Sequence, residues 1–488
     1  MSNKSFFIVS CARSGSTSLT KILNLATNCE CAMEPTPNLN VETRLAMEGK
    51  LTNYEPIVKE TIVKRVKASK AEIYGEKNVT YGPFIKTIHE LLNAKFVFLI
   101  RDGRDVVRSL IDWHEKAFGT VYRECKEIGN LNEKALQNAS NLPIHKDTSD
   151  YSRPRPLLGT QLYEKWENLT REEMCAFYWS YINELYISQL KQIPQKSWIS
   201  LDYTNPNRTD ILKVINFLGL EGLNAEKIQE ILDENVNSLK DRFGIEKSYP
   251  NWKNWNGGLR RCFDQIAEST MQKLGYYKDH STRWKPENYG STWINQGANN
   301  EWYGKIYEAR KQIHEHFIQW VNEREPIESI TDFGCGLGVG YSEAFKDKRF
   351  IGIDINPQCI EWCKKNRKNP NHEYLNQDFI ASPLKKKTDI VFSSGTIDNT
   401  YDIDECLKSM VKSAKKHIYL TAYRGWFQEL EEHKYQWNPI DGCFYNDISP
   451  KQIFKTLNIL RCTNITIEPL IIENLLETLI TANVENIK

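Results

Sequence analysis

Alternating apolar and polar stretches along the chain predict two regions that are each built from strands and helices. The first starts at the N-terminus, where residues 5–10 read as a strand, a polar turn follows, and an apolar-periodic helix continues to Leu25. The second covers residues 329–345 and has the same strand, glycine-rich turn and helix order. Further helical and strand patterns alternate after each region, which predicts an α/β fold with two parallel-sheet domains.

The segment 281–300 separates the two regions and is expected to be a linker. It is polar, and Pro286, Gly290 and Gly297 interrupt regular structure there. We therefore expect one domain at residues 1–280 and another at 301–488, the second opening with an amphipathic helix over 303–323. The tryptophans of the linker predict that it packs against a neighbour. A polar insertion at 116–164 is either an acceptor-binding lid or a solvated loop.

Composition excludes several classes of protein. The chain of 488 residues is 40% hydrophobic and 26% charged, as in globular proteins. Its 64 Lys and Arg residues nearly balance 63 Asp and Glu residues. No global charge therefore attracts nucleic acid, and any anionic partner must be held by a local site.

Segments that would direct the chain to a membrane or an oxidising compartment are not expected. No apolar run approaches the roughly 18 residues of a membrane-spanning helix, and the N-terminus does not read as a signal peptide. The twelve cysteines are scattered, so we expect reduced thiols, no metal site and a cytoplasmic protein.

The turn after the first strand has the residues of an anion-binding loop. A helix N-terminus offers unpaired N–H groups, a glycine admits close approach, hydroxyls donate, and an arginine adds a planar cation. The alternative is an ordinary capped helix. The Walker lysine pattern is absent, which disfavours a nucleotide kinase. The candidate anion-binding residues are Arg13, Ser14, Gly15, Ser16, Thr17 and Ser18.

A second anion site is predicted at the end of another buried strand. Residues 95–100 (KFVFLI) read as that strand, and Arg101 follows at the edge where open α/β sheets bind ligands. Ser109 comes about two helical turns later. An arginine and a hydroxyl at this spacing can hold a second phosphate.

These two elements resemble the sulfotransferase family over roughly residues 1–280. Residues 12–19 (ARSGSTSL) look like its 5′-phosphosulfate loop, with Ala12 in place of the usual proline, and Arg101 with Ser109 matches its 3′-phosphate motif. Residues 252–277 look like its last helix. The resemblance implies a P-loop-like fold, 3′-phosphoadenosine 5′-phosphosulfate (PAPS) as donor, and no metal.

The same resemblance implies two catalytic residues. Glu34 matches the general base of tyrosylprotein and related bacterial sulfotransferases, which takes the proton of the acceptor hydroxyl. Lys77 matches a lysine that would offset charge on the sulfuryl and leaving oxygens. Asn78 and Val79 depart from the family's Thr-Pro at this point.

The second glycine-rich turn has different chemistry. Asp332, Gly334, Gly336 and Gly338 form D-x-G-x-G-x-G, which is not the nicotinamide pattern G-x-G-x-x-G. The next strand, 349–353, is followed by Asp354, where a carboxylate is placed to bind ribose hydroxyls.

This segment resembles class I S-adenosylmethionine (SAM) methyltransferases over roughly residues 300–460, which implies a Rossmann-like fold. By resemblance the three glycines line the methionine and ribose of SAM, Asp354 takes the ribose diol, and Asp378 lies near the adenine amine. Residues 389–396 match the motif beside the transferring methyl. Four residues remain candidates for acceptor contact, or plain surface: Asp398, Asn399, Arg424 and His433.

The sequence therefore predicts a bifunctional transferase that moves sulfuryl from PAPS to a hydroxyl and methyl from SAM, to oxygen. A saccharide, a glycoconjugate precursor or another small natural product is the expected acceptor. Two alternatives remain: an ATP-dependent small-molecule kinase fused to a methyltransferase, and a non-catalytic scaffold with one decayed domain. The acceptors, the order of the two steps and the oligomeric state stay open.

Overall fold

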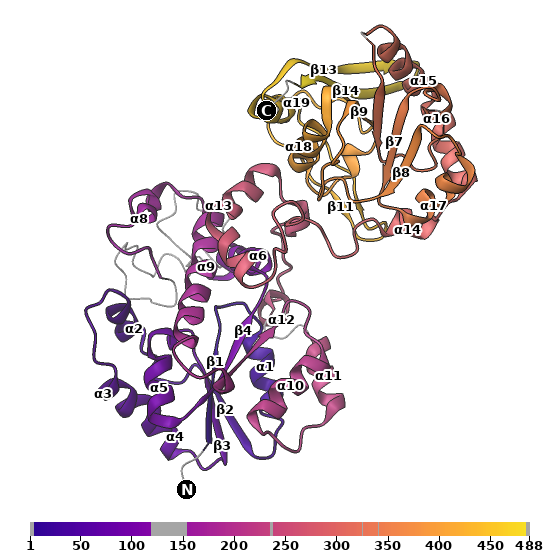
Figure 1. Cartoon of the computed structure of the whole chain (residues 1–488). Helices are drawn as coiled ribbons and strands as arrows, with labels where there is room; N and C mark the ends of the chain where they lie inside the picture. Colours follow the sequence, from indigo (N-terminus) through magenta and orange to yellow (C-terminus); the bar gives the residue numbers. More distant parts are fainter. Residues whose placement is uncertain (1–3, 119–153, 235–237, 325, 340, 485–488) are drawn as a thin grey trace. The chain divides into compact units, whose positions relative to one another are not determined.

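The structure, a computed structural model, describes residues 4–118, 154–234, 238–324, 326–339 and 341–484 (Figure 1). The chain forms two compact units. The first comprises Met1–Trp252 and Arg261–Tyr276, and the second Lys253–Arg260 and Tyr277–Lys488. The division falls within helix α13 (Gly257–Lys273). Most of the insertion predicted at 116–164 lies outside the described residues.

The first unit contains a five-stranded sheet in the order β2-β3-β1-β4-β5, and all its neighbouring strands are parallel. This arrangement agrees with the α/β pattern of the sequence. Its strands are β1 (Lys4–Val9), β2 (Cys29–Met33), β3 (Ile73–Lys77), β4 (Lys95–Ile100) and β5 (Trp198–Asp202).

Helices cover both faces of this sheet. On one face, Leu19 and Ile22 of α1 pack with Phe6 and Ile8 of β1, together with apolar residues of α10 and α11. On the other face, Phe98 meets the Tyr186 ring of α9 at 6.0 Å between centroids. The described helices are α1 (Ser16–Leu23), α2 (Asn40–Met47), α3 (Glu55–Val58), α4 (Lys64–Ala68), α5 (Ile85–Leu92), α6 (Gly103–Trp113), α8 (Gln161–Lys165), α9 (Arg171–Leu190), α10 (Arg208–Leu218), α11 (Ala225–Asp233), α12 (Leu239–Phe243) and most of α13.

The second unit contains a seven-stranded sheet in the order β13-β14-β10-β9-β6-β7-β8. β14 runs in the direction opposite to the other six strands, so its pairings with β13 and β10 are antiparallel and the remaining pairings are parallel. The chain winds outward from β6 in one direction and from β9 in the other, so the sheet has a topological switch point between them. Its strands are β6 (Ser329–Phe333), β7 (Arg349–Asp354), β8 (His372–Asn376), β9 (Thr388–Ser394), β10 (Ala414–Ala422), β13 (Cys462–Ile472) and β14 (Leu475–Val484).

Helices again cover both faces. Phe317 of α15 stacks on Phe392 of β9 with centroids 3.8 Å apart, while Leu407 and Met410 of α18 pack against the opposite face with Ile418. A small hairpin joins β11 (Trp437–Asn438) to β12 (Cys443–Phe444). The helices are α14 (Ser291–Gln296), α15 (Asn300–Asn322), α16 (Tyr341–Ala344), α17 (Pro357–Asn366), α18 (Ile403–Ser413) and α19 (Pro450–Ile459).

Candidate active sites

The loop between β1 and α1 has a conformation that its neighbours enforce. Gly15 has a φ of 86°, and a Cβ there would lie 2.1 Å from Cδ1 of Tyr203, so only glycine fits. Arg13 also has a positive φ, 67°, a strained conformation of the kind that clusters at binding sites. The Ala12 amide donates to Oη of Tyr178 at 2.7 Å. The loop is thus braced by two tyrosines from elsewhere in the unit.

The residues predicted at two separate phosphate sites converge on this loop. Nε of Arg13 donates to Oγ of Ser109 at 3.0 Å, and Nη1 of Arg101 donates to the Arg13 carbonyl at 3.0 Å. The Arg13 guanidinium also lies 4.1 Å from the centroid of the Trp113 ring. Nε of Arg101 is buried and has no hydrogen-bond partner among the described residues. An anion at this edge would meet two guanidinium groups and a hydroxyl.

The serines of the loop are less available than the sequence suggests. Ser14, Ser16 and Ser18 are all buried, whereas Thr17 is half-buried. Oγ of Ser14 contacts Sγ of Cys11 at 2.9 Å, and Oγ of Ser18 accepts from Oη of Tyr203 at 2.7 Å. Ser14 and Ser18 therefore help to hold the loop.

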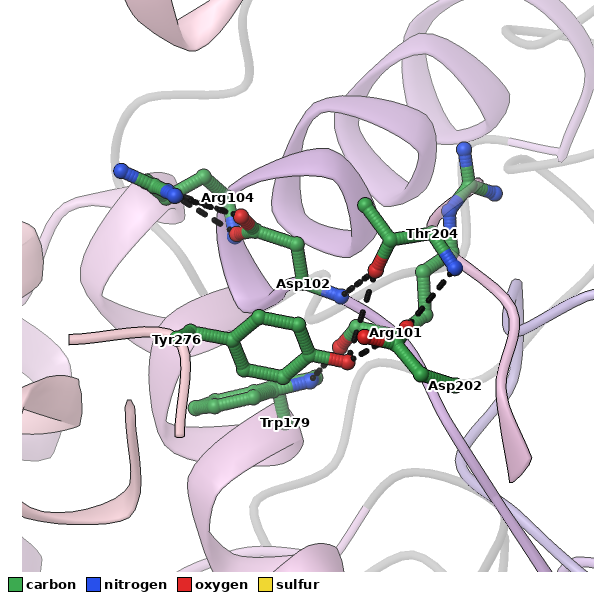
Figure 2. Close-up of polar contacts among 7 residues, drawn as sticks. All are labelled: Arg101, Asp102, Arg104, Trp179, Asp202, Thr204 and Tyr276. Atoms are coloured by element: carbon green, nitrogen blue, oxygen red, sulfur yellow. Dashed lines mark hydrogen bonds and ion pairs between the residues drawn. The ribbon is translucent and has the colours of Figure 1, made fainter. Parts of the chain in front are cut away.

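The end of β4, which carries Arg101, is braced by side chains from three other segments (Figure 2). Nε1 of Trp179 in α9 donates to the Arg101 carbonyl at 3.0 Å, and the Asp102 amide donates to Oγ1 of Thr204 at 2.9 Å. Thr204 in turn lies 3.4 Å from Oη of Tyr276. These bonds fix the backbone from which the Arg101 side chain extends.

The two predicted catalytic residues form an ion pair. Nζ of Lys77 lies 2.7 Å from Oε1 of Glu34, and the Glu34 amide donates to the Lys77 carbonyl at 2.8 Å. Lys77 ends β3 and Glu34 follows β2, its neighbour in the sheet. The Lys77 side chain is 3% exposed and the Glu34 side chain is 55% exposed, so only the carboxylate is open to an incoming acceptor.

Sequence reasoning missed Lys247. Desolvation, followed by the positive charges of Arg108, Arg101 and Arg13, lowers the pKa of Lys247. Lys247 therefore lies within electrostatic reach of these three arginines, and we call the four residues the cradle: Arg13, Arg101, Arg108 and Lys247. Arg108 lies on α6, the helix that begins two residues after Arg101. Lys247 could not be placed from the sequence because no periodic element carries it.

The segment that carries Lys247 is tied to α6. Oδ1 of Asp112 accepts from the amides of Ser248 and Tyr249 at 2.9 Å each, and Nε of Arg108 donates to the Tyr249 carbonyl at 2.9 Å. Asp112 is fully buried. These bonds hold the backbone next to Lys247 against α6.

The second unit has a cavity of about 460 Å³ at the carboxyl edge of its sheet. Residues at or next to the ends of β6, β7 and β9 line it, so it lies at the switch point, where open α/β sheets bind ligands. Gly338, the remaining predicted residue, lies in the same loop, where its amide donates to the Cys335 carbonyl at 2.8 Å. The predicted residues that line the cavity are Asp332, Gly334, Gly336, Asp354 and Asp378.

The glycine-rich loop is packed as tightly as the loop of the first unit. Gly334 has a φ of 86°, and a Cβ there would lie 2.3 Å from Oγ1 of Thr396. At Gly336 a Cβ would lie 2.7 Å from Cε1 of Tyr303. The backbone can therefore approach a ligand closely, which side chains would prevent.

The three carboxylates of the cavity have different environments. Asp354 accepts from the amides of Gly336 and Asn356 at 2.8 Å each, so it also orders the glycine loop. Asp378 accepts from Nζ of Lys285 at 2.7 Å. Burial, followed by the charge of Asp354, raises the pKa of Asp332 to about 8.

The acceptor candidates differ in access. Asn399 lines the cavity. Asp398 and His433 are completely buried, and Arg424 forms an ion pair with Asp447 at 3.2 Å. Asn399 is therefore the one of these four candidates that can contact a ligand in this cavity.

Sequence reasoning missed the contribution of α15. Seven of its residues line the cavity, and four of them recur at helical spacing on one face. The sequence expectation for this helix was only that it is amphipathic. Its aromatic and cationic residues were the available signal that it also lines a site. Segment 281–300 lies in the second unit, and it also supplies lining residues, including Tyr289 and Trp293. The lining residues of α15 on this face are Tyr303, Tyr307, Arg310 and His314.

Among the described residues no group of three His, Cys, Asp or Glu side chains could hold a metal ion. The cysteines of the described ranges are free thiols. No helix of those ranges is long and apolar enough to span a membrane.

Comparison with known proteins identifies part of the second unit. Residues 326–464 match the model of a methyltransferase domain. The chain is also similar to a malonyl-[acyl-carrier protein] O-methyltransferase of Acetivibrio thermocellus, with 26% identity over 119 residues, which is 23% of this chain and 42% of that protein. The second unit therefore contains a methyltransferase domain with a Rossmann-like fold.

Solved methyltransferases resemble the chain only distantly. Magnesium protoporphyrin IX methyltransferase of Synechocystis, with bound SAM, is 13% identical, covers 46% of this chain and 95% of its own, and has a TM-score of 0.28. An N-methyltransferase of Bradyrhizobium japonicum with S-adenosylhomocysteine is 11% identical, covers 41% and 99%, and has a TM-score of 0.30.

Proposed function

We propose that the chain is a bifunctional transferase, in which the second unit transfers a methyl group from SAM and the first unit transfers a sulfuryl group from PAPS. The observation that supports methyl transfer most is the cavity at the switch point of a methyltransferase domain. The observation that supports sulfuryl transfer is the convergence of Arg13, Arg101 and Ser109 on one loop.

The residues of the second cavity fit SAM. The glycine loop leaves space that a Cβ would fill, and Asp354 stands at the end of β7, where it can accept from ribose hydroxyls. Asp378 lines the same cavity and would accept from the adenine amine. SAM supplies an activated methyl group, and we propose that an oxygen of the acceptor receives it. Asn399 and Tyr423 line the wall and are available to orient that acceptor.

The cradle of the first unit fits a donor with phosphates at both ends. The buried, unpartnered Nε of Arg101 is a donor that a phosphate oxygen would satisfy. The loop from Arg13 to Ser18 ends at the N-terminus of α1, which favours an anion through its amides and dipole. In this assignment α1 and Arg13 hold the phosphosulfate, while Arg101 and Ser109 hold the 3′-phosphate.

Glu34 and Lys77 then have complementary roles. The acceptor oxygen attacks sulfur while Glu34 takes its proton, and the bond between sulfur and the bridging phosphate oxygen breaks. Lys77 stabilises the negative charge that develops on that oxygen. The existing ion pair keeps both groups together at the carboxyl edge of the sheet. No metal ion takes part in this proposal.

We propose one acceptor, or one pathway, for both units, with a saccharide, a glycoconjugate precursor or a small natural product as its class. Such molecules have several hydroxyl groups that two transferases can modify.

Ligand binding tests both assignments on the whole chain. We expect 3′-phosphoadenosine 5′-phosphate (PAP) and S-adenosylhomocysteine each to stabilise the protein against heat, because a ligand at 100 times its Kd adds about 2.7 kcal/mol. Arg101→Ala should abolish the stabilisation by PAP and leave the stabilisation by S-adenosylhomocysteine unchanged. Stabilisation by ATP but not PAP would support the kinase alternative, and no effect of either product would support the scaffold.

A further inference from the structure

Two side chains in the wall of the methyltransferase cavity form a pair that has unused hydrogen-bonding groups. Nδ2 of Asn399 donates to the Phe444 carbonyl at 2.6 Å and to Oη of Tyr423 at 3.2 Å. Because a carbonyl oxygen only accepts, the contact with Phe444 fixes which amide atom is the nitrogen. Oδ1 of Asn399 and the hydroxyl proton of Tyr423 have no hydrogen-bond partner among the described residues, and both residues line the cavity.

The backbone that carries this pair is held by Asp398, which is completely buried. Its carboxylate accepts from the amides of Tyr423 at 3.0 Å and Arg424 at 3.1 Å, and its carbonyl accepts from the amide of Asn446 at 2.8 Å. The chain after β10 and the chain after β12 are therefore both tied to the segment of Asn399. The pair thus has a fixed place in the wall.

A neutral hydroxyl group is complementary to this pair. Its proton can be donated to Oδ1 of Asn399 while its oxygen accepts from Oη of Tyr423. A carboxylate or a sulfate has no proton to donate to Asn399, and an ammonium has no lone pair to accept from Tyr423. The pair therefore distinguishes a hydroxyl group from both kinds of ion.

The charges around the cavity also disfavour an anionic acceptor. Among the described lining residues, Arg310 is the only arginine or lysine, and its two terminal nitrogens contact Glu477 at 2.7 and 2.8 Å. Burial, followed by the charge of Arg310, lowers the pKa of His314 to about 3, so this imidazole is neutral. Lys285 is paired with Asp378 at 2.7 Å. Since an anion buried without a cationic partner is costly, this lining favours an uncharged acceptor.

Aromatic rings line the cavity beside the pair. Oη of Tyr289 donates to the Asn399 carbonyl at 3.1 Å, and the rings of Tyr289 and Trp293 have centroids 5.8 Å apart with planes at 72°. Both residues line the cavity. Rings of this kind offer a large apolar contact area. A ring with an apolar face, whether of a sugar or of an aromatic molecule, fits this wall.

We propose that the methyl acceptor is an uncharged ring compound whose hydroxyl group binds between Oδ1 of Asn399 and Oη of Tyr423. This inference rests on the proposed methyl transfer from SAM. In that step the acceptor oxygen bonds to the methyl carbon, the bond from this carbon to sulfur breaks with its electron pair left on sulfur, and the hydroxyl proton passes to water. An acceptor that already carries sulfate is anionic, so on a shared acceptor methyl transfer precedes sulfuryl transfer.

Two matched pairs of probes test the class of acceptor, by calorimetry on the whole chain saturated with S-adenosylhomocysteine. One pair is 2-naphthol and 6-hydroxynaphthalene-2-sulfonate, and the other is methyl β-glucoside and its 6-sulfate. In each pair both members have a hydroxyl group and only the second is an anion. We expect a neutral probe to bind and its anionic partner to bind at least about tenfold more weakly. The neutral probe that binds identifies the ring as aromatic or saccharide.

Two variants test the contacts. Tyr423→Phe removes only the hydroxyl group, and Asn399→Leu removes the amide. Each should weaken the neutral probe by about tenfold and leave the affinity for S-adenosylhomocysteine within about twofold. Tyr445→Phe is the matched control, because Tyr445 lines the same cavity but its hydroxyl donates to Oδ2 of Asp441 at 2.7 Å. It should leave both affinities within about twofold.

Four results would overturn the inference. They are an anionic probe that binds as tightly as its neutral partner, no binding of either neutral probe, unchanged probe affinity in Tyr423→Phe and Asn399→Leu, and equal losses in all three variants. Failure of the wild type to bind S-adenosylhomocysteine would instead overturn the proposed methyl transfer.

Discussion

At the scale of single residues, Asp332 gives the second unit a pH-dependent stability. Its pKa rises from 3.8 to about 8 on folding, so the folded state keeps a proton that the unfolded state releases. Stability is therefore fully present below about pH 4 and is lost as the pH rises through about 8. Asp332→Asn stays neutral, and we expect it to be more stable than the wild type by about 1–3 kcal/mol at pH 8, with the difference vanishing towards pH 4.

Urea unfolding followed by tryptophan fluorescence at a series of pH values measures this difference. The charge of Asp354 contributes to the shift, and Asp332→Asn removes that repulsion as well. Parallel stability curves for the two proteins would show that Asp332 is ionised in the folded state.

Glu34 is the residue on which the sulfuryl transfer depends. We expect Glu34→Gln to lower the rate of transfer from PAPS by at least about 100-fold, the lower range for a general base, with PAP affinity unchanged. Glu30→Gln is the control, because Glu30 is an exposed carboxylate on β2, the strand that Glu34 directly follows. Product formation from radiolabelled PAPS measures the rate. Normal sulfation by the Glu34 variant would remove Glu34 from the mechanism.

Single residues also show which features of the sites could be predicted from the sequence and which could not. Arg13, Arg101 and Ser109 could be selected because each follows or lies near a recognisable strand end. Their mutual hydrogen bonds, and the ion pair of Glu34 with Lys77, depend on which strands are neighbours, and hydrophobic pattern does not encode that order. His314 and Lys247 were missed because only tertiary packing brings them to a site.

At the scale of elements, the loop between β1 and α1 should tolerate no side chain at Gly15. Gly15→Ala faces both a positive φ and the ring of Tyr203, whereas Gly49→Ala faces a φ of 71° with open space around it. We expect the first change to cost about 2–4 kcal/mol and to abolish PAP binding, and the second to cost about 1–2 kcal/mol without affecting PAP.

Thermal unfolding with and without PAP distinguishes the two variants. Equal destabilisation would mean that Tyr203 moves aside readily and that the contact at Gly15 does not shape the loop.

Most elements were predictable from pattern, but their surroundings were not. The strand expected at 95–100 is β4, and the helix expected at 303–323 is α15. Segment 281–300 shows what sequence pattern cannot predict. Proline and glycine correctly marked its turns, and Trp284 is buried as its tryptophans predicted. The same turn signals cannot tell a linker from a cavity wall, and Tyr289 and Trp293 line the cavity.

At the scale of the whole molecule, the last part of α13 should be needed by the first unit. Oγ1 of Thr270 donates to Oε1 of Glu184 at 2.9 Å, and Oη of Tyr276 donates to Oδ1 of Asp202 at 3.0 Å. A fragment of residues 1–276 should therefore fold cooperatively and bind PAP. A fragment of residues 1–256 loses these bonds and should melt at a lower temperature or not fold.

Circular dichroism on the two fragments measures this difference, with PAP binding as a second readout. Equal melting temperatures would show that α13 adds nothing to the first unit.

The cradle also has a consequence for the choice of buffer. The positive charges of Arg108, Arg101 and Arg13 all act on Lys247, so any small polyvalent anion in solution is a competitor for the cradle. Sulfate or phosphate in a crystallisation or assay medium would occupy the cradle, raise the melting temperature and hide the effect of the nucleotide. Measured in dilute chloride, where screening is weakest, the same protein should show its tightest nucleotide binding and its lowest intrinsic stability.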